Sequence, residues 1–567
     1  MYLIGAMGLM ASLHSPAEAE PKIATSQAVS HTTIAANFLA ARQALYLNDL
    51  GTSADFYLAA LQLDNGMNGN LLRQSFLTQY QLGNIDAAAA LARRMQTVNI
   101  TAGFTSEPTT AQAIKQQDWD AVLVLTDHIA ENMTAQPIAA IIRAWTLVAK
   151  GQAGRGLAEI QKAGRMIHKN DALIPAVFLM QAAKIAQYSG NIRDRDGFLR
   201  DLLARDSLST QITLQLATML AQLGDQEAAL RLVTRLPNGF NIKQVTAFLA
   251  NPPPPPSIAN QIATGIVDAS VISTGMMARD GQNGQSSQAK VMLTARLGLA
   301  LYLDPDLDVA RFLLAQTLST SQQIKPAQVM IDGIADDSIW SQPRLLLRLD
   351  IERRNDINAA IERLKATLAK SRDNAFLLKE MGDLYRMADQ FAEARNAYLA
   401  SQKLGFTSSD MHRSLGIAYE RLDQDGLAET SFMAALAENP NDPFTLNYIG
   451  YWWADEGRNL EQAIKLIERA VRLRPKSGYF VDSLGWVHFK IGNNDLAVAF
   501  LEQATILEPA DAIITDHLGD AYWQAGRQNE ARFKWRYALQ LANDNAGNDA
   551  DTGNIELKTA LIKKLAQ

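Results

Sequence analysis

The sequence has 567 residues, of which 48% are apolar, and its 53 basic and 59 acidic residues give a formal net charge of -6. A chain with this apolar share can bury a core, so wholesale disorder is excluded. The absence of cysteine excludes a disulfide scaffold, thiolate metal sites and a cysteine nucleophile. The mild acidic balance argues against a nucleic-acid partner, because phosphate backbones need a concentrated basic surface.

The N-terminal residues have the features of a secretory signal peptide. Residues 2–13 are apolar and uncharged but too short to span a bilayer, and Ala17 and Ala19 fit the small-residue cleavage pattern. We expect residues 1–19 to be cleaved after Ala19 and residues 20–36 to form a flexible linker. The protein would then be periplasmic or exported, with no integral membrane segment after cleavage. Because residues 2–13 carry no Lys or Arg, a cytoplasmic protein with an apolar N-terminus is the alternative.

Residues 37–250 show helical periodicity with a weak repeat signal. Small residues recur at Ala41 and Ala60, and glycine turns follow Leu82 and Leu223. No stretch shows the alternation of apolar and polar residues that is typical of strands. We therefore expect degenerate helical hairpins across this region.

A run of five prolines interrupts the chain at residues 251–257. Successive prolines lack the backbone donors that a helix needs, so this segment is expected to be extended. Residues 258–277 can form the next helix, and the polar stretch 279–287 an enlarged turn. We interpret the prolines as a semi-rigid spacer between two superhelical halves. A ligand for an SH3-like domain is the alternative, although no Lys or Arg stands beside the prolines to anchor it.

The C-terminal third is an internal repeat. Glycines recur every 34 or 35 residues, at Gly382, Gly416, Gly450, Gly485 and Gly519. Each glycine is followed at a fixed distance first by alanine and then by a large residue, in the pairs Ala394/Tyr398, Ala428/Phe432, Ala463/Ile467, Ala497/Leu501 and Ala531/Trp535. Glycine and alanine let two antiparallel helices approach closely, and the large residue fills the space between them.

This pattern resembles the tetratricopeptide repeat, and the segment from Leu415 to Pro440 matches the consensus at every position. The resemblance implies an all-α fold, a right-handed superhelical α-solenoid of antiparallel helix hairpins. We expect the array to cover residues 258–542 and to be clearest over 376–542. A polar loop at 543–554 and a C-terminal capping helix at 555–567 would follow, because the open end of a solenoid needs a polar cap.

The resemblance also implies a concave groove lined by the first helix of each hairpin. Its groove-facing positions carry over to Arg413, Asn447, Tyr451, Asp482, Trp486, Phe489, Asp516, Asp520 and Trp523. We expect the aromatic residues to anchor, and the acidic residues to steer, a partner segment that has apolar and basic side chains. The alternative is that these aromatics pack between adjacent repeats and bind nothing.

No catalytic motif is recognisable in the sequence. The nearest pattern, His128 followed by Glu131, lacks the second histidine that a zinc site would need. We expect a non-catalytic scaffold for protein partners in the bacterial cell envelope, with no cofactor, metal or small-molecule substrate. One alternative is a cytosolic regulator or co-chaperone-like adaptor. Another is an enzyme with an unrecognised site in the N-terminal half, which a cluster of convergent polar residues in a deep pocket there would support.

Overall fold

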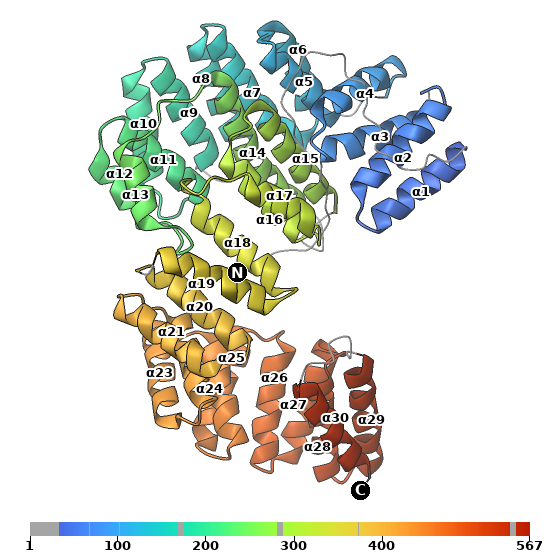
Figure 1. Ribbon diagram of the computed structural model, residues 1–567, viewed down its shortest axis with the longest axis vertical. Coiled ribbons are helices and arrows are strands. Elements are labelled where there is room, and N and C mark those ends of the chain that lie inside the picture. The colour runs from blue at the N-terminus through green and yellow to red at the C-terminus, as the bar shows by residue number, and fades with distance from the viewer. Residues whose placement is uncertain are drawn as a thin grey trace. The chain divides into compact units, whose positions relative to one another are not determined.

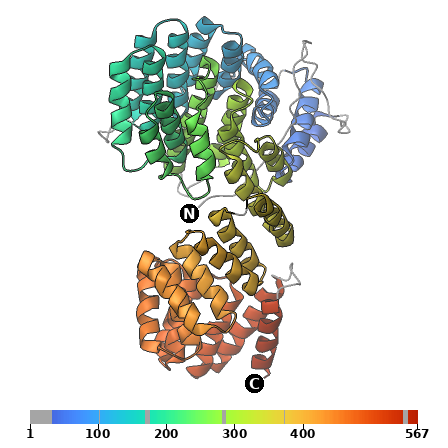
Figure 2. The same ribbon diagram turned by 60° about the vertical axis from the view of Figure 1, so that its left-hand side comes forward.

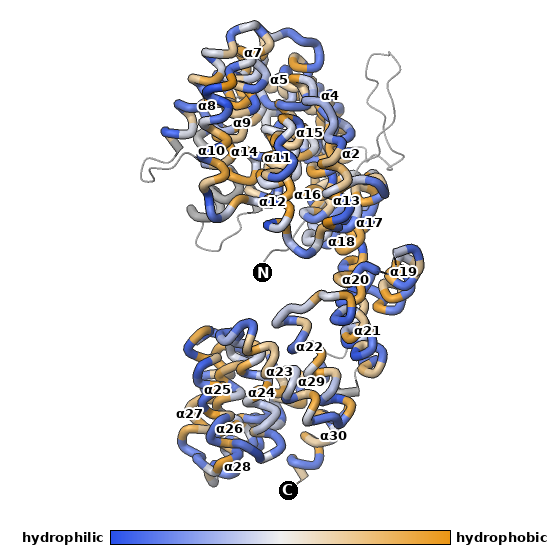
Figure 3. The backbone as a smooth tube through the Cα atoms, turned by 90° about the vertical axis from the view of Figure 1, so that its left-hand side faces the viewer, coloured by the Kyte–Doolittle hydropathy of each residue, from blue (hydrophilic) through white to orange (hydrophobic). Residues whose placement is uncertain are grey.

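A computed structural model describes residues 33–66, 68–100, 103–167, 175–280, 287–371, 373–544 and 552–566. These ranges contain helices and turns but no β-strand. Hydrophobic and hydrophilic residues alternate along the helices (Figure 3), as expected of helices that bury one face. Among the described helices, none is both long and apolar enough to cross a membrane. The predicted signal peptide lies outside the described residues.

The chain folds into two compact units, of which the first, unit 1, ends at Asn355 and the second, unit 2, begins at Asp356. Unit 1 contains two short 3-10 helices, Gly103–Thr105 and Met133–Ala135, and eighteen α-helices (Figure 1) within its described residues. These are α1 (Ile34–Tyr46), α2 (Leu50–Leu63), α3 (Gly69–Gln81), α4 (Ile85–Thr97), α5 (Ser106–Lys115), α6 (Trp119–Ala130), α7 (Gln136–Ala149), α8 (Ala153–Ile167), α9 (Ala176–Tyr188), α10 (Ile192–Leu203), α11 (Thr210–Gln222), α12 (Gln226–Val233), α13 (Ile242–Ala250), α14 (Ile258–Asp280), α15 (Ser287–Leu303), α16 (Asp308–Ser319), α17 (Ile324–Asp332) and α18 (Ser341–Arg353).

The predicted division at the proline run is wrong. Helix α14 follows the prolines and packs against α7, and α15 packs against α3 and α5. Figure 2 shows both helices, in green, among the helices of unit 1. The prolines lie outside any helix, but they belong to unit 1 itself, where the Gln222 side chain donates a hydrogen bond of 2.6 Å to the Pro253 carbonyl. The sequence signal failed because an extended segment can run along the surface of one unit as well as between two.

A buried ion pair ties α15 to the early helices of unit 1. The Arg296 guanidinium donates to both carboxylate oxygens of Glu107, at 2.7 Å and 3.1 Å for the shortest contact to each. The Tyr80 hydroxyl donates to the same carboxylate at 2.5 Å, and all three side chains are almost fully buried. Removing two charges from water is costly unless both are well bonded, so this contact holds α3, α5 and α15 in one arrangement.

Unit 2 is a regular series of hairpins, from α20 to α29, with one further helix at each end. Its helices are α19 (Ile357–Lys370), α20 (Ala375–Met387), α21 (Phe391–Lys403), α22 (Ser409–Glu420), α23 (Asp425–Glu438), α24 (Pro443–Asp455), α25 (Leu460–Leu473), α26 (Gly478–Lys490), α27 (Asn494–Leu507), α28 (Ala512–Gln524), α29 (Gln528–Asp544) and α30 (Thr552–Leu565). The all-α solenoid of antiparallel helix hairpins is therefore confirmed.

The glycines of the repeat stand where paired helices touch. A Cβ atom on Gly416 would lie 2.6 Å from the Phe432 ring, and one on Gly485 would lie 2.6 Å from Leu501. Both partners are fully buried. The packing thus follows the predicted rule, in which glycine on the first helix receives a large side chain from the second.

Polar caps and left-handed turns set the helix ends in unit 2. The Asp442 carboxylate accepts the backbone N–H of Thr445 at 3.1 Å at the start of α24, and Asp511 does the same for Ile514 at 2.9 Å at the start of α28. Gly526, between α28 and α29, has a φ of +78°, which side-chain-bearing residues rarely adopt. Short turns of this kind keep the paired helices antiparallel.

Several predicted boundaries shift in the structure. Helix α1 begins at Ile34, inside the segment predicted as a linker. Helix α29 continues to Asp544 and α30 begins at Thr552, so both ends of the predicted polar loop are helical and its centre lies outside the described residues. The predicted array over 258–542 also spans the division at Asn355, because α14 to α18 belong to unit 1.

Candidate functional site

The first helices of the unit 2 hairpins form its inner side. Helix α20 contacts α22, α24 contacts α26, and α26 contacts α28, whereas contacts between neighbouring second helices are weaker or absent among the described residues. Helices that lie closer together line the concave side of a curved stack. The predicted partner-binding residues all lie on first helices, from α22 to α28, and we call the side that these helices line the concave face.

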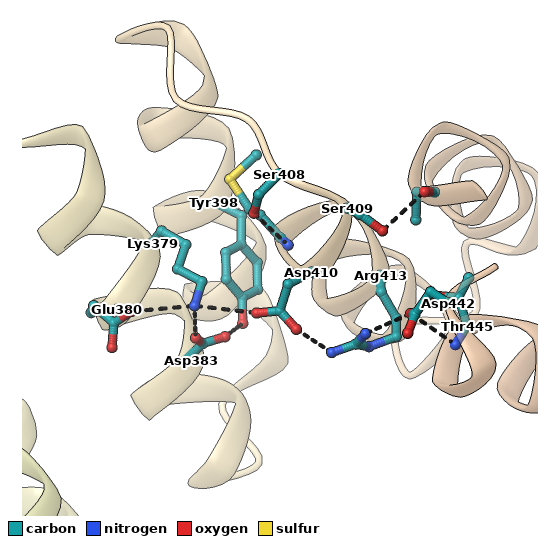
Figure 4. Close-up of polar contacts among 12 residues, drawn as sticks. Lys379, Glu380, Asp383, Tyr398, Ser408, Ser409, Asp410, Arg413, Asp442 and Thr445 are labelled. Atoms are coloured by element: carbon teal, nitrogen blue, oxygen red, sulfur yellow. Dashed lines mark hydrogen bonds and ion pairs between the residues drawn. The ribbon is translucent and has the colours of Figure 1, made fainter. Parts of the chain in front are cut away.

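Polar contacts join the first three of these helices (Figure 4). On α20, the Lys379 ammonium lies 2.6 Å from the Asp383 carboxylate and 3.3 Å from Asp410 on α22. Asp410 also pairs with Arg413, whose guanidinium reaches Asp442 at the start of α24 at 2.8 Å. The charges of this region are thus matched across successive repeats, and Arg413 is engaged within the chain.

The contacts continue from α22 to α26. The Tyr448 hydroxyl on α24 donates to the Glu420 carboxylate on α22 at 3.0 Å. Further along α24, Asp455 accepts the Trp486 indole N–H at 3.3 Å and lies 3.2 Å from the Lys490 ammonium, both on α26. Polar contacts therefore join each first helix to the next from α20 to α26.

Asp482 meets a histidine of the next repeat. Its carboxylate lies 2.9 Å from His517 Nδ1, and both side chains are buried. Burial alone would lower the pKa of His517. The charge and hydrogen bond of Asp482, together with the charges of Asp516 and Asp520, raise it by a larger amount, so the pKa lies above its usual value. Asp482 is therefore bonded to a histidine of its own chain, a contact that the sequence did not predict.

The C-terminal helix occupies the acidic end of this face. The Lys564 ammonium on α30 lies 2.7 Å from a carboxylate oxygen of Asp516 and 2.7 Å from one of Asp520. Asp520 also accepts the Trp535 indole N–H at 3.0 Å, and Leu561 of α30 is fully buried beside it. A basic and apolar segment is bound here as predicted for a partner, but it belongs to the same chain.

The predicted aromatic anchors remain partly accessible. Trp486 stacks on Phe489, with ring centroids 4.8 Å apart, and on the His517 ring, while Trp523 packs against Trp535. All of the predicted aromatics are half-buried, and burial with Asp455 and Asp482 raises the pKa of Tyr451 to about 12. Asn447 is half-buried, and its Oδ1 accepts no hydrogen bond from the described residues. These side chains pack between repeats and also present a surface.

A second polar cluster, in unit 1, has no counterpart among the predicted residues. The buried Asp268 carboxylate on α14 accepts hydrogen bonds from Gln181 at 3.1 Å, from Gln215 at 3.0 Å and from Gln211. Gln215 accepts in turn from the Lys184 ammonium at 2.6 Å. Burial raises the pKa of Asp268 to about 6, against the opposing effects of Lys184 and the three amides.

The sequence held no signal for this cluster. Asp268 is 87 residues from Gln181 and 53 from Gln215, in the half of the chain where the repeat register is weakest. Its five members include no serine, histidine or cysteine, the residues that most often pair as nucleophile and base. Among the described residues, no group of three or more His, Asp or Glu is arranged to hold a metal ion.

Comparison with known proteins adds little to this geometry. The sequence matches no protein-family model and no curated protein. Among solved structures, the anaphase-promoting-complex hetero-tetramer Cut9–Hcn1 has a chain that is 12% identical, with a TM-score of 0.39 and coverage of 94% of this chain and 97% of that one. PilF from Pseudomonas aeruginosa is 17% identical, with a TM-score of 0.28 over 34% and 92% of the two chains. MamA from Desulfovibrio magneticus is 17% identical, with a TM-score of 0.27 over 30% and 96%. Likenesses of this size bear on neither function nor partners.

Proposed function

We propose that this protein is a non-catalytic scaffold that binds segments of partner proteins on the concave face of unit 2. The observation that supports the proposal is the way in which α30 is bound. The carboxylates of Asp516 and Asp520 bind its Lys564, and its buried Leu561 lies in the same hydrophobic cluster as neighbouring indoles. The face is thus built to receive an apolar segment with a basic side chain. A partner of the same chemistry would use the surface that α30 leaves open.

That open surface centres on Tyr451, Trp486 and Phe489. The stacked rings of Trp486 and Phe489 are rigid and amphipathic, which suits an anchor that loses little entropy on binding. Beside them, Asp455 offers a half-exposed carboxylate, but it is shared with Lys490. Affinity at this surface would come mainly from aromatic burial, with charge contributing to orientation.

Site-specific photo-crosslinking tests the proposal. A photoreactive residue replaces Tyr451 on the concave face or, as a control, Ile506, which is 78% exposed on the second helix α27. We expect discrete protein adducts in cells from position 451 and none from position 506. The Trp486→Ala substitution should abolish the adducts while leaving the circular dichroism spectrum unchanged. Equal adducts from both positions, or adducts that survive Trp486→Ala, would contradict the proposal.

We also propose that the scaffold works in the bacterial cell envelope after export. The support is the apolar, uncharged stretch 2–13 followed by Ala17 and Ala19. Fractionation of a C-terminally tagged full-length chain, with N-terminal sequencing of the mature product, tests this. We expect a product that begins at Glu20 in the periplasmic fraction. An intact N-terminus in the cytoplasmic fraction would instead support the cytosolic adaptor.

A further inference from the structure

Unit 1 encloses two adjoining cavities on the inner side of its helices. The larger, about 790 Å³, lies between α9, α11, α14, α16 and α18, and the smaller is about 480 Å³. Both volumes fall within the range of about 300–1,000 Å³ that is typical of ligand sites. Gln211, Val309 and Trp340 line both, so the two cavities are direct neighbours.

The larger cavity has an electrostatic preference. Among the described residues, its lining includes two carboxylates, Asp268 and Asp350, but no Lys, Arg or His, and Lys184 lines the smaller cavity. Asp350 is paired with Arg353 and Arg354, which leaves Asp268 as the carboxylate that faces the cavity without a direct ion pair among the described residues. Three glutamine amides fix its position, so the negative charge is held in place before any ligand arrives.

Aromatic and aliphatic side chains form most of the remaining wall. The Trp340 ring packs against Phe312 and Phe240, with centroids 5.1 Å and 5.3 Å away. Val271 on α14 lines the cavity and is 49% exposed, so apolar surface stands open to solvent at the rim. Aromatic faces and a fixed carboxylate together favour a cationic group attached to an apolar body.

The smaller cavity carries a polar atom that lacks a partner. Gln261 on α14 lines it and is only 5% exposed, and its Oε1 accepts no hydrogen bond from the described residues. A buried acceptor without a donor costs free energy, and a ligand N–H placed there would remove the cost. Amide side chains match a peptide backbone well, because each offers both a donor and an acceptor.

We propose that the two cavities bind an extended peptide segment in which a lysine or arginine is flanked by apolar residues. The cationic side chain meets Asp268 in the larger cavity, apolar neighbours pack on Trp340 and Phe312, and a backbone N–H reaches Gln261 in the smaller one. This site is separate from the concave face of unit 2 and goes beyond the function proposed for that face. Lys564 and Leu561, seated between carboxylates and indoles, show that this chain already uses the same chemistry.

Binding of a designed peptide series to the full-length protein tests the proposal. The probes are fluorescein-labelled nonapeptides with the core Leu-Val-X-Val-Leu, where X is Lys, Gln or Glu, measured by fluorescence anisotropy. We expect the Lys peptide to bind at least about ten-fold more tightly than the Gln peptide, as one charge-assisted hydrogen bond allows. The Glu peptide should bind least. In Asp268→Asn the Lys and Gln peptides should bind equally.

Because Asp268 is buried and its substitution could unfold the protein, a second variant tests the same cavity from its exposed rim. Val271→Lys places a cation at the exposed rim of the larger cavity and should weaken the Lys peptide about ten-fold or more. Its matched control is Val124→Lys on α6, where the valine is 61% exposed and lines neither cavity. This control should leave peptide binding unchanged.

Trp486→Ala in unit 2 should also leave peptide binding unchanged. Loss of binding in that variant would assign the peptide to the concave face and overturn the unit 1 site. Equal binding of all three peptides, or competition by hexylamine as strong as by the Lys peptide, would overturn the proposal too.

Discussion

The two units solve the same packing problem in different ways. In unit 2, a repeated glycine receives a large residue from the paired helix, and polar contacts join each first helix to the next. In unit 1, the hairpins are irregular, and contacts between helices far apart in sequence hold them, above all the Glu107–Arg296 pair. In unit 1 the wall of the larger cavity comes from helices far apart in sequence and includes a buried carboxylate. The irregular unit is therefore where a new site could arise.

Truncation should have the largest effect and tests where the units divide. A chain that ends at Asn355 should fold, because it keeps α14 and α15 against α7, α3 and α5. A chain that ends at Asn251 loses both helices and exposes Ile141, Ile142 and other residues of the buried cluster that they cover. We expect the longer fragment to be monomeric and cooperative in thermal unfolding, and the shorter one to aggregate. A soluble, cooperative shorter fragment would restore the proline run as a boundary.

Among single substitutions in unit 1, we expect one that breaks the buried ion pair to lower the free energy of unfolding most. Arg296→Met leaves the Glu107 carboxylate buried beside Tyr80 without a cation and should cost about 3–5 kcal/mol. The matched control is Arg231→Met, which breaks the exposed pair with Glu227 and should cost no more than about 0.5 kcal/mol. Urea unfolding of the full chain, with hydrogen exchange to locate the change, measures both. A cost for Arg296→Met as small as the control would show that long-range contacts do not organise unit 1.

Two glycine substitutions, one in each unit, test whether close helix approach is particular to unit 2. Gly416→Ala drives a methyl group to 2.6 Å from the buried Phe432 ring and should destabilise unit 2 by about 1–3 kcal/mol. Gly197→Ala lies within α10 of unit 1, where nothing stands within 4 Å of the new methyl, and should stabilise by up to about 1 kcal/mol through helix propensity. Changes of the same sign in thermal unfolding would mean that the close helix approach in unit 2 is not the source of its regularity.

The sequence predicted most of unit 2 and little of the unit 1 site, for a physical reason. Gly416 and Phe432 meet because a hairpin brings residues a fixed distance apart into contact, so their spacing is visible in the chain. Asp268 and Gln181 meet because α14 packs back on much earlier helices, and no local spacing records that. Likewise the repeat spacing places Asp516 and Asp520 on the first helix of the last hairpin, where they lie, but no spacing predicts that Lys564 reaches them. A periodic pattern reports contacts between neighbours, and these contacts are not between neighbours in the repeat.

The titration of Asp268 should make the free energy of unfolding of unit 1 depend on pH. The pKa of Asp268 is about 6 in the folded protein, above the value of about 3.9 for an unfolded aspartate, so the folded state binds the proton more tightly. Stability should therefore rise as pH falls from about 7 towards 4 and be lost as pH rises through 6, by on the order of 1–3 kcal/mol. Urea unfolding at pH 5 and pH 8 measures this change. Asp268→Asn should remove that part of the difference, and an unaltered difference in the variant would show that Asp268 does not titrate there.

The contact between α30 and the concave face should give the smallest effect and decide what α30 does. Lys564→Gln weakens the bonds to Asp516 and Asp520, and because the lysine is 24% exposed, we expect a cost of about 1 kcal/mol. Lys563→Gln removes the same charge from an exposed position one residue earlier and is the matched control. Faster hydrogen exchange confined to α30 in Lys564→Gln, together with more crosslinked partner at position 451, would mean that α30 and the partner compete for one surface. Faster exchange in α30 with unchanged crosslinking would mean that α30 only caps the last hairpin, because the acidic end of the face would then be exposed without gaining a ligand.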